Sequence, residues 1–216
     1  IYDVKDRPEV KPLSLMVPDA GAFDAVCRDV PPAARALAEK FWPGPLTIVL
    51  PAKDTVSAIV RAGGDTVGLR CPDHARTLAL LRSAGVPLAA PSANPSGAPS
   101  PKTAGEVLAY FDGKIDAVID GGPCGIGTES TIIDLAHEPY SILRRGALSE
   151  ETVFAALRES VTLIGITGGS GSGKTTALDT LRGMGALVLD CDAIYHDLTV
   201  SCADMQRELT ARFGDV

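Results

Sequence analysis

The chain has 216 residues, of which 45% are hydrophobic and 22% are charged, and its net charge at pH 7 is −7. This length suits one large domain or two small ones, and the apolar content excludes a disordered chain. No apolar run reaches the roughly 18 residues of a membrane helix, and the negative charge argues against a protein that coats nucleic acid.

Short apolar runs and amphipathic stretches follow one another in the first 148 residues, which predicts an α/β fold. Strands are expected over 13–17, 46–50, 66–71, 88–90, 117–119, 131–135 and 140–143. Helices are expected over 20–27, 33–41, 74–84 and 103–110, and Thr103 is the expected N-cap of the last of them. The segment 91–101 is rich in Pro, Ser and Gly and is expected to be an irregular loop.

The character of the sequence changes after Gly146. Ser149 is the expected N-cap of a helix that ends near Ser160. Two further apolar strands are expected over 161–167 and 186–189, with a glycine loop and a helix over 176–182 between them. The predicted organisation is a domain over 1–148, a linker helix over 149–160 and a second domain over 161–216.

Both ends of the sequence are abrupt. The chain begins at Ile1 with no charged and apolar leader, and it stops at Val216 with no helix-ending signal. We therefore expect a piece of a longer protein. The five cysteines are odd in number and include no CxxC pair, which favours a reducing, cytoplasmic location. The three histidines show no metal-ligand spacing.

The glycine loop at 168–175 reads GGSGSGKT and fits the phosphate-binding pattern GxxxxGK[ST], with an apolar strand before it and a helix after it. Its backbone N–H groups can surround phosphate oxygens, Lys174 adds a positive charge, and the Thr175 hydroxyl can bind Mg²⁺. The residues expected to bind ATP here are Gly168, Gly169, Ser170, Gly171, Ser172, Gly173, Lys174, Thr175 and Thr176. A plain Gly/Ser linker is disfavoured, because a linker has no reason to lie between a strand and an amphipathic helix.

Two acids, Asp190 and Asp192, follow the strand expected at 186–189. Carboxylates at this position next to a phosphate loop can hold Mg²⁺ or accept a proton from an attacking hydroxyl. The alternative is that they cap the following helix.

The run ITGGSGSGKTT, followed by LRGMGALVLDCDAIYH, resembles the start of dephospho-coenzyme A kinase over residues 161–213. The resemblance implies transfer of the ATP γ-phosphate to the ribose 3′-hydroxyl of dephospho-CoA. It makes Asp192 the base that activates this hydroxyl, with Lys174 and Thr175 on the nucleotide phosphates and Mg²⁺. Asp190 is a second candidate Mg²⁺ ligand. His196 stands where many members have Arg, and no role is assigned to it.

Polar groups also gather at motifs in the first domain. Lys5 and Arg7 are two residues apart, and in an extended stretch this spacing places both on one side, where they suit a di- or triphosphate. Taken alone, the pair is explained better as two charged surface residues. Ser92 and Asn94 follow an expected strand and can bind a nucleotide or can belong to an ordinary turn.

Six motifs in this order resemble the threonylcarbamoyl-adenylate synthase (YrdC-like) family over residues 1–148: KxRP with PL, FWPGPLT, GGDTVGLRCP, APSANPSG, GTESTIID and ILRRGAL. The resemblance implies a twisted mixed α/β sheet with flanking helices around a deep cavity, followed here by the start of a P-loop kinase parallel α/β domain. Members of the family condense L-threonine, bicarbonate and ATP into threonylcarbamoyl-AMP and pyrophosphate for the t⁶A modification of tRNA.

The same resemblance implies roles for individual residues. Lys5 and Arg7 would neutralise the triphosphate and the leaving pyrophosphate. Ser92 and Asn94 would bind ATP or Mg²⁺-linked phosphate oxygens. The residues that would contact the nucleotide are Ser130 and Arg144, and those that would be structural or substrate-adjacent are Arg70 and Thr47. The family carries a segment ahead of the KxR motif that this chain lacks, so weak turnover is expected.

Three hypotheses for the function remain open. The first is a bifunctional enzyme with both activities, whose substrates are threonine, bicarbonate, ATP and dephospho-CoA. Its further expected partners are tRNA or tRNA-modification proteins, and no membrane is expected. The second is a synthase whose P-loop region is vestigial or regulatory. The third is a module that binds double-stranded RNA or tRNA, and the net charge of −7 disfavours it.

Overall fold

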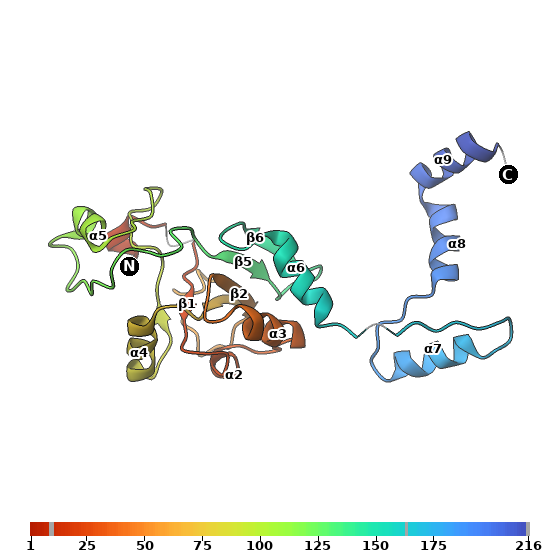
Figure 1. Ribbon diagram of the computed structural model, residues 1–216, viewed down its shortest axis with the longest axis horizontal. Coiled ribbons are helices and arrows are strands. Elements are labelled where there is room, and N and C mark those ends of the chain that lie inside the picture. The colour runs from red at the N-terminus through yellow and green to blue at the C-terminus, as the bar shows by residue number, and fades with distance from the viewer. Residues whose placement is uncertain (9–10, 163, 215–216) are drawn as a thin grey trace. The chain divides into compact units, whose positions relative to one another are not determined.

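The computed structural model describes residues 1–8, 11–162 and 164–214. The chain divides into two compact units, Ile1–Thr162 and Leu163–Val216, and each is described by itself. Figure 1 shows the elements of both units in chain order. Within the described residues, no helix combines the length and the apolar composition that a membrane crossing requires.

A six-stranded mixed sheet forms the centre of the first unit, in the order β4-β1-β3-β2-β5-β6. The strands are β1 (Leu15–Met16), β2 (Leu46–Pro51), β3 (Thr66–Arg70), β4 (Leu88–Ala89), β5 (Thr131–Asp134) and β6 (Ser141–Arg144). The pairs β1/β3 and β2/β5 are parallel, and the pairs β1/β4, β2/β3 and β5/β6 are antiparallel. The mixed α/β sheet expected from the sequence is confirmed.

Six helices accompany this sheet. They are α1 (Tyr2–Lys5), α2 (Ala22–Val26), α3 (Pro32–Phe41), α4 (Ala75–Ala84), α5 (Ala104–Phe111) and α6 (Glu150–Glu159). Two N-caps expected from the sequence are confirmed: Thr103 accepts a hydrogen bond from the backbone N–H of Glu106, and Ser149 accepts one from that of Thr152.

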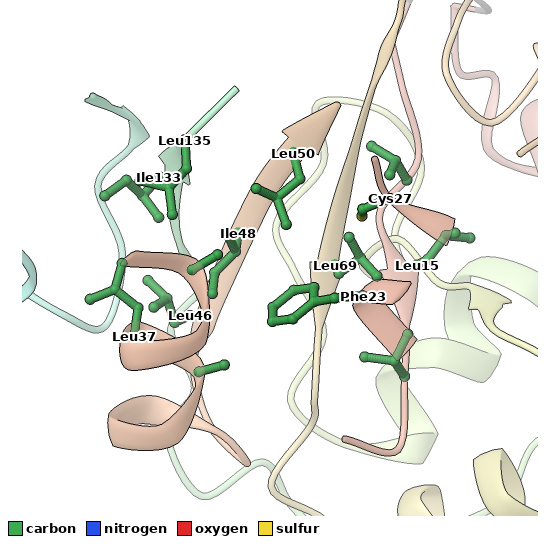
Figure 2. Packing of buried hydrophobic residues seen from close by; sticks show 14 of the residues in the cluster. Leu15, Phe23, Cys27, Leu37, Leu46, Ile48, Leu50, Leu69, Ile133 and Leu135 are labelled. Carbon is green, nitrogen blue, oxygen red and sulfur yellow. The ribbon is translucent and has the colours of Figure 1, made fainter. Parts of the chain in front are cut away.

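One face of the sheet packs against helices to form the core. Leu46, Ile48 and Leu50 alternate along β2 and are fully buried, because side chains on one face of a strand are two residues apart. Phe23 of α2 and Leu37 of α3 are buried in the same cluster, and Figure 2 shows them beside the strand residues. The intervening residues of the strands therefore face the other side of the sheet.

Helix α6 belongs to the packing of the first unit. It lies beside α3 (Figure 1). Its Val153 and Ala156 are buried in the core cluster. Lys40 of α3 forms an ion pair of 2.5 Å with Glu159 at the end of α6. The segment expected to be a linker helix thus covers part of the core.

The second unit contains α7 (Lys174–Gly183), α8 (Cys191–Ser201) and α9 (Ala203–Phe213). The helix expected over 176–182 is confirmed as α7. Helices α8 and α9 follow one another directly and contact each other.

Three strands expected from apolar runs are not formed. Residues 117–119 are irregular, with Ile119 exposed, and neither 164–167 nor 186–189 pairs with a strand in the described part of the chain. Residue 163 of the strand expected over 161–167 lies outside the described residues. An apolar run does not by itself form a strand, because a strand needs a neighbouring ladder and a buried face. The expected parallel strands of the P-loop domain are therefore wrong for the described residues.

Candidate active site

A cavity of about 660 Å³ opens on the first unit. Met16, Thr47 and Arg70 line it, and each is adjacent in sequence to a residue of the core cluster. Because side chains alternate along a strand, the cavity lies on the sheet face opposite the core helices.

Loops form the rest of the cavity lining. Most of its residues from the connecting segments fall in 90–93, 100–103 and 118–130, and Ser14, Asp73 and His74 add to them. Gly68 of β3 leaves room beneath them, since a Cβ there would lie 3.2 Å from Cγ2 of Thr47 and 3.3 Å from Oγ of Ser14. The expected irregular loop over 91–101 thus supplies part of this surface.

Ser130 and Arg144 meet at the cavity, and Thr47 joins them. The Arg144 Nε and Nη2 donate to the Ser130 carbonyl at 3.0 and 2.8 Å, and Nη2 also donates to the Ser130 hydroxyl at 2.9 Å. The hydroxyls of Ser130 and Thr47 are 2.8 Å apart. Three residues from β2, β6 and the start of β5 therefore form one hydrogen-bonded cluster.

Glu129, which was not predicted as a site residue from the sequence, extends this cluster. Its Oε2 lies 2.6 Å from Nη1 of Arg144, and its Oε1 accepts a hydrogen bond of 3.0 Å from the Ser100 hydroxyl. The available signal was its place directly before Ser130 in the motif GTESTIID.

A close backbone approach holds the two motifs of the cluster together. A Cβ at Gly146 would lie 2.4 Å from the Glu129 carbonyl oxygen, so only glycine fits there without a shift. The backbone N–H of Ala147 donates to that carbonyl at 2.9 Å, and the Thr131 hydroxyl donates to the carbonyl of Leu148 at 2.7 Å. The segment after β6 is thereby fixed against the start of β5.

Lys5 is buried at the end of α1, and it fixes the loop after β4. Its Nζ donates to the carbonyls of Ser92 and Asn94, and its own carbonyl accepts from the backbone N–H of Ser96. Burial lowers the pKa of Lys5 and the charge of Arg7 lowers it further, while Glu129 acts in the opposite direction. The charge of Lys5 is therefore partly balanced by the cluster at the cavity.

The expected extended arrangement of Lys5 and Arg7 is wrong. Lys5 ends a short helix, and Asp6 follows in the left-handed conformation at φ 49°, which turns the chain. Arg7 instead donates to the carbonyl of Pro12 at 2.9 Å. Among the described residues, the cavity lining includes neither Lys5 nor Arg7.

Asn94 is also buried, with 7% of its surface exposed. Its Nδ2 donates to the carbonyls of Pro95 and Ala98 at 3.1 and 2.6 Å, whereas its Oδ1 has no hydrogen-bond partner within the described ranges. Ser92 lines the cavity, but Asn94 lies outside the lining.

Arg70 supplies a second guanidinium at the cavity. Its Nε donates to the carbonyl of Gly44 at 3.1 Å. Burial lowers the pKa of Arg70, and the charge of Arg144 lowers it further. The positive charges of these two guanidinium groups repel each other, so this wall of the cavity is suited to bind an anion.

Other lining residues were not expected from the sequence. Lys102 adds a positive charge, and its carbonyl accepts from the backbone N–H of Cys124 at 2.8 Å. Arg76 of α4 donates to the carbonyl of Asp120 at 2.5 Å, which ties α4 to the 118–130 segment. No local pattern indicates these contacts, because they join segments far apart in the sequence.

The glycine loop of the second unit turns through two glycines of positive φ just before α7. Gly171 and Gly173 have φ of 75° and 85°, and Gly173 is the N-cap of α7. Lys174 Nζ donates to the carbonyls of Gly168 and Gly169 at 2.5 and 2.8 Å. Thr175 and Thr176 follow in the first turn of the helix.

Asp190 caps α8. Its Oδ1 accepts from the backbone N–H groups of Asp192 and Ala193 at 3.1 and 3.2 Å, which is the capping arrangement left open by the sequence. Asp192 lies in the first turn of α8 and is exposed. The Thr175 hydroxyl and these carboxylates are oxygen donors of the kind Mg²⁺ prefers, so their chemistry fits this ion. Within the described residues, no three acidic, His or Cys side chains gather into a metal cluster.

Two family models match the chain. A model for Sua5, YciO and YrdC proteins, described as telomere recombination, matches residues 1–146. A model for dephospho-CoA kinase matches residues 162–216.

Curated relatives share the first part of the chain. The threonylcarbamoyl-AMP synthase of Bacillus subtilis is 44% identical over 158 residues, which cover 73% of this chain and 46% of the relative. The synthase of Pyrococcus abyssi is 42% identical over 159 residues, 74% of this chain and 47% of the relative. The chain thus spans about half the length of these two relatives.

Solved structures show the same fold. The structure of Pyrococcus abyssi Sua5 complexed with L-threonine matches with a TM-score of 0.70 at 42% identity, over 72% of this chain and 46% of that one. Escherichia coli YciO matches with a TM-score of 0.64 at 24% identity, over 71% of this chain and 74% of that one. Since the model for Sua5, YciO and YrdC proteins spans residues 1–146 and the sheet has the fold of these structures, the chain belongs to the Sua5, YciO and YrdC family.

Proposed function

We propose that the first unit synthesises threonylcarbamoyl-AMP from L-threonine, bicarbonate and ATP. The observation that carries this proposal is the cavity above the sheet, where Arg144 donates to the hydroxyl of Ser130 and Arg70 lines the same cavity. Two cations and a hydroxyl suit a nucleotide phosphate. A related protein, Pyrococcus abyssi Sua5, has been solved with L-threonine.

The reaction needs positioning and charge neutralisation more than side-chain proton transfer. The threonine amine attacks the carbon of CO₂ and loses a proton to water, or attacks bicarbonate with loss of a water molecule, and forms a carbamate. A carbamate oxygen then attacks the α-phosphorus of ATP, the bond to the bridging oxygen breaks, and pyrophosphate leaves. Arg70 and Arg144 would neutralise the charge on the phosphates, while Ser92 and Ser130 would hold the nucleotide.

Lys5, Arg7 and Asn94 have a proposed role at the phosphates as well. Lys5 also donates to the carbonyls of Ser92 and Asn94, which supports a second role for it: fixing the loop that contains Ser92. The unpartnered Oδ1 of Asn94 can accept a hydrogen bond from a ligand or bind a cation that accompanies ATP.

For the second unit we propose the nucleotide-binding part of a dephospho-CoA kinase. The turn at Gly171 and Gly173, which begins α7, supports this proposal. Lys174 would leave its two carbonyls for the phosphates, and Asp192 would accept the proton of the attacking hydroxyl. Thr175 and Asp190 would hold Mg²⁺, which neutralises charge on the phosphates when bound.

The proposed partners are these small substrates, together with tRNA or tRNA-modification proteins that receive the product. A cytoplasmic location is proposed with them. It is supported by the five cysteines, all of which are free thiols in the structure.

The synthase proposal is tested by pyrophosphate release and by mass spectrometry of the adenylate. Release that requires both L-threonine and bicarbonate, and that falls strongly with Arg144→Ala, is the expected result. Pyrophosphate release that continued without threonine would overturn the proposal. The kinase proposal is tested separately, by γ-phosphate transfer to dephospho-CoA, and would fail if no transfer occurred.

A further inference from the structure

The nitrogens of the Arg144 guanidinium are divided between two partners. Nε and Nη2 donate to the carbonyl and the hydroxyl of Ser130. Nη1 lies 2.6 Å from Oε2 of Glu129. Ser130 is thus sufficient to set the plane of the guanidinium, and Glu129 takes the nitrogen that Ser130 leaves.

The Glu129 carboxylate is itself held at the cavity. Its Oε1 accepts from the Ser100 hydroxyl at 3.0 Å, and both residues line the cavity with Arg144. The side chains of Arg144 and Glu129 are 40% and 43% exposed. An ion pair this accessible contributes little to the stability of a fold, so it can be exchanged for another anion at small cost.

Glu129 acts on more than one positive charge, in a lining whose cations are Arg70, Lys102 and Arg144 and whose acids are Asp73, Asp120 and Glu129. Arg70 lines the same cavity, and the charge of Arg144 lowers its pKa. Glu129 also acts on the charge of Lys5. A carboxylate and a phosphate bind a guanidinium through the same forked hydrogen bonds, so they compete for it.

We propose that Glu129 is an internal counter-ion of Arg144, which an anionic group of the ligand displaces from Nη1. Glu129 then keeps the charge of Arg144 paired while the cavity is empty, and it weakens the retention of anionic ligands. This inference rests on the proposed function, because it takes an ATP phosphate as the displacing anion.

The test measures ATP affinity by calorimetry in the full chain with Lys174→Ala, so that the glycine loop contributes little to binding. Glu129→Gln removes the charge and is expected to tighten ATP binding by about fivefold, the size of one exposed like-charge contact. The uncharged probe adenosine should bind both chains equally. In an Arg144→Ala background, Glu129→Gln should change ATP affinity much less.

Glu150→Gln is the matched control. Glu150 forms an ion pair of 3.3 Å with Arg145, the residue that follows Arg144 in the sequence. Neither Glu150 nor Arg145 belongs to the cavity lining. Replacing Glu150 by Gln changes the net charge by the same amount as Glu129→Gln. Equal tightening by Glu150→Gln, equal tightening for adenosine, or weaker ATP binding by Glu129→Gln would each overturn the inference. If ATP bound neither the Lys174→Ala chain nor its Glu129→Gln variant, the proposed function itself would fail.

Discussion

At the scale of single residues, buried charges explain how the site is held. Lys5 has 6% of its surface exposed, and its ammonium group satisfies two carbonyls of the loop after β4. A buried carbonyl that loses its donor costs free energy, because no water replaces the bond. Lys5 is therefore structural even where it does not touch a ligand.

We expect Lys5→Met to lower the free energy of unfolding by about 1–3 kcal/mol, since the carbonyls of Ser92 and Asn94 lose their donor. Urea unfolding followed by circular dichroism measures this change. Lys114→Met, at an exposed turn position, is the control and should leave the midpoint unchanged. Equal midpoints for the two variants would contradict the structural role of Lys5.

His137 carries a pH dependence. Its Nδ1 lies 2.9 Å from Oδ2 of Asp134, and this hydrogen bond, with the charge of Asp134, raises the pKa of His137 above 6.5. The raised pKa means that the pair stabilises the fold fully below the unfolded-state pKa and that this contribution is lost as the pH rises through the folded-state pKa.

We therefore expect His137→Gln to reduce the unfolding free energy more at about pH 5.5 than at about pH 8.5. Chemical denaturation at the two pH values measures the difference, and an NMR titration should show a lower His137 pKa in Asp134→Asn. A larger effect of His137→Gln at the higher pH would contradict this sign.

At the scale of elements, the cavity depends on how segments approach one another. The segment after β6 lies against the start of β5 through Gly146, which places Arg144 beside Ser130. A side chain at 146 would meet backbone atoms of Glu129 and Ser130, which cannot move aside as a flexible side chain can.

Gly146→Ala is expected to destabilise the first unit by about 1–3 kcal/mol, the usual cost of overpacking, and to weaken ATP binding together with stability. Thermal unfolding and ATP calorimetry on the same samples measure both. Gly105→Ala is the matched control, because it lies outside the cavity lining and the one contact of a Cβ there is Oγ1 of Thr103 at 4.0 Å. An unchanged melting temperature for Gly146→Ala would mean that the two segments separate freely.

Elements were predictable from sequence where local signals sufficed. Apolar runs predicted β2 and β3, and the capping residues Thr103 and Ser149 predicted helix starts. The runs at 117–119 and 186–189 failed because a run of apolar residues does not say which strand would pair with it.

The same division holds for the site. The residues Ser92, Ser130 and Arg144 were predicted from motifs, and the cavity contains them. Glu129 and Lys102 were not, because their contacts with the cavity depend on the tertiary approach of distant loops. Lys5 was singled out, but the helix and the left-handed Asp6 that aim it at the loop were not.

At the scale of the whole molecule, the chain contains two compact units with different candidate sites. The cavity lining belongs to the first unit, and the glycine loop belongs to the second. Because the two candidate sites lie in different units, a substitution at one site can remove one reaction and leave the other intact.

In a protein that carries out both reactions, we expect Lys174→Ala to remove γ-phosphate transfer to dephospho-CoA and to leave threonine-dependent pyrophosphate release unchanged. Arg144→Ala should do the reverse, because its guanidinium lies at the other site. Assays of both reactions on both variants measure this separation. Loss of both reactions from either change would show that the two sites are coupled.

The sheet of the first unit encodes core and cavity in the same few residues. Along β2, Leu46 and Ile48 face the helices while Thr47 faces the cavity, and Leu69 and Arg70 divide in the same way on β3. A slip of one residue in strand register would exchange the two sets and place a guanidinium in the core. Substitutions that change ligand preference can therefore be confined to the alternate strand positions that face the cavity. The positions between them face the core and remain reserved for folding.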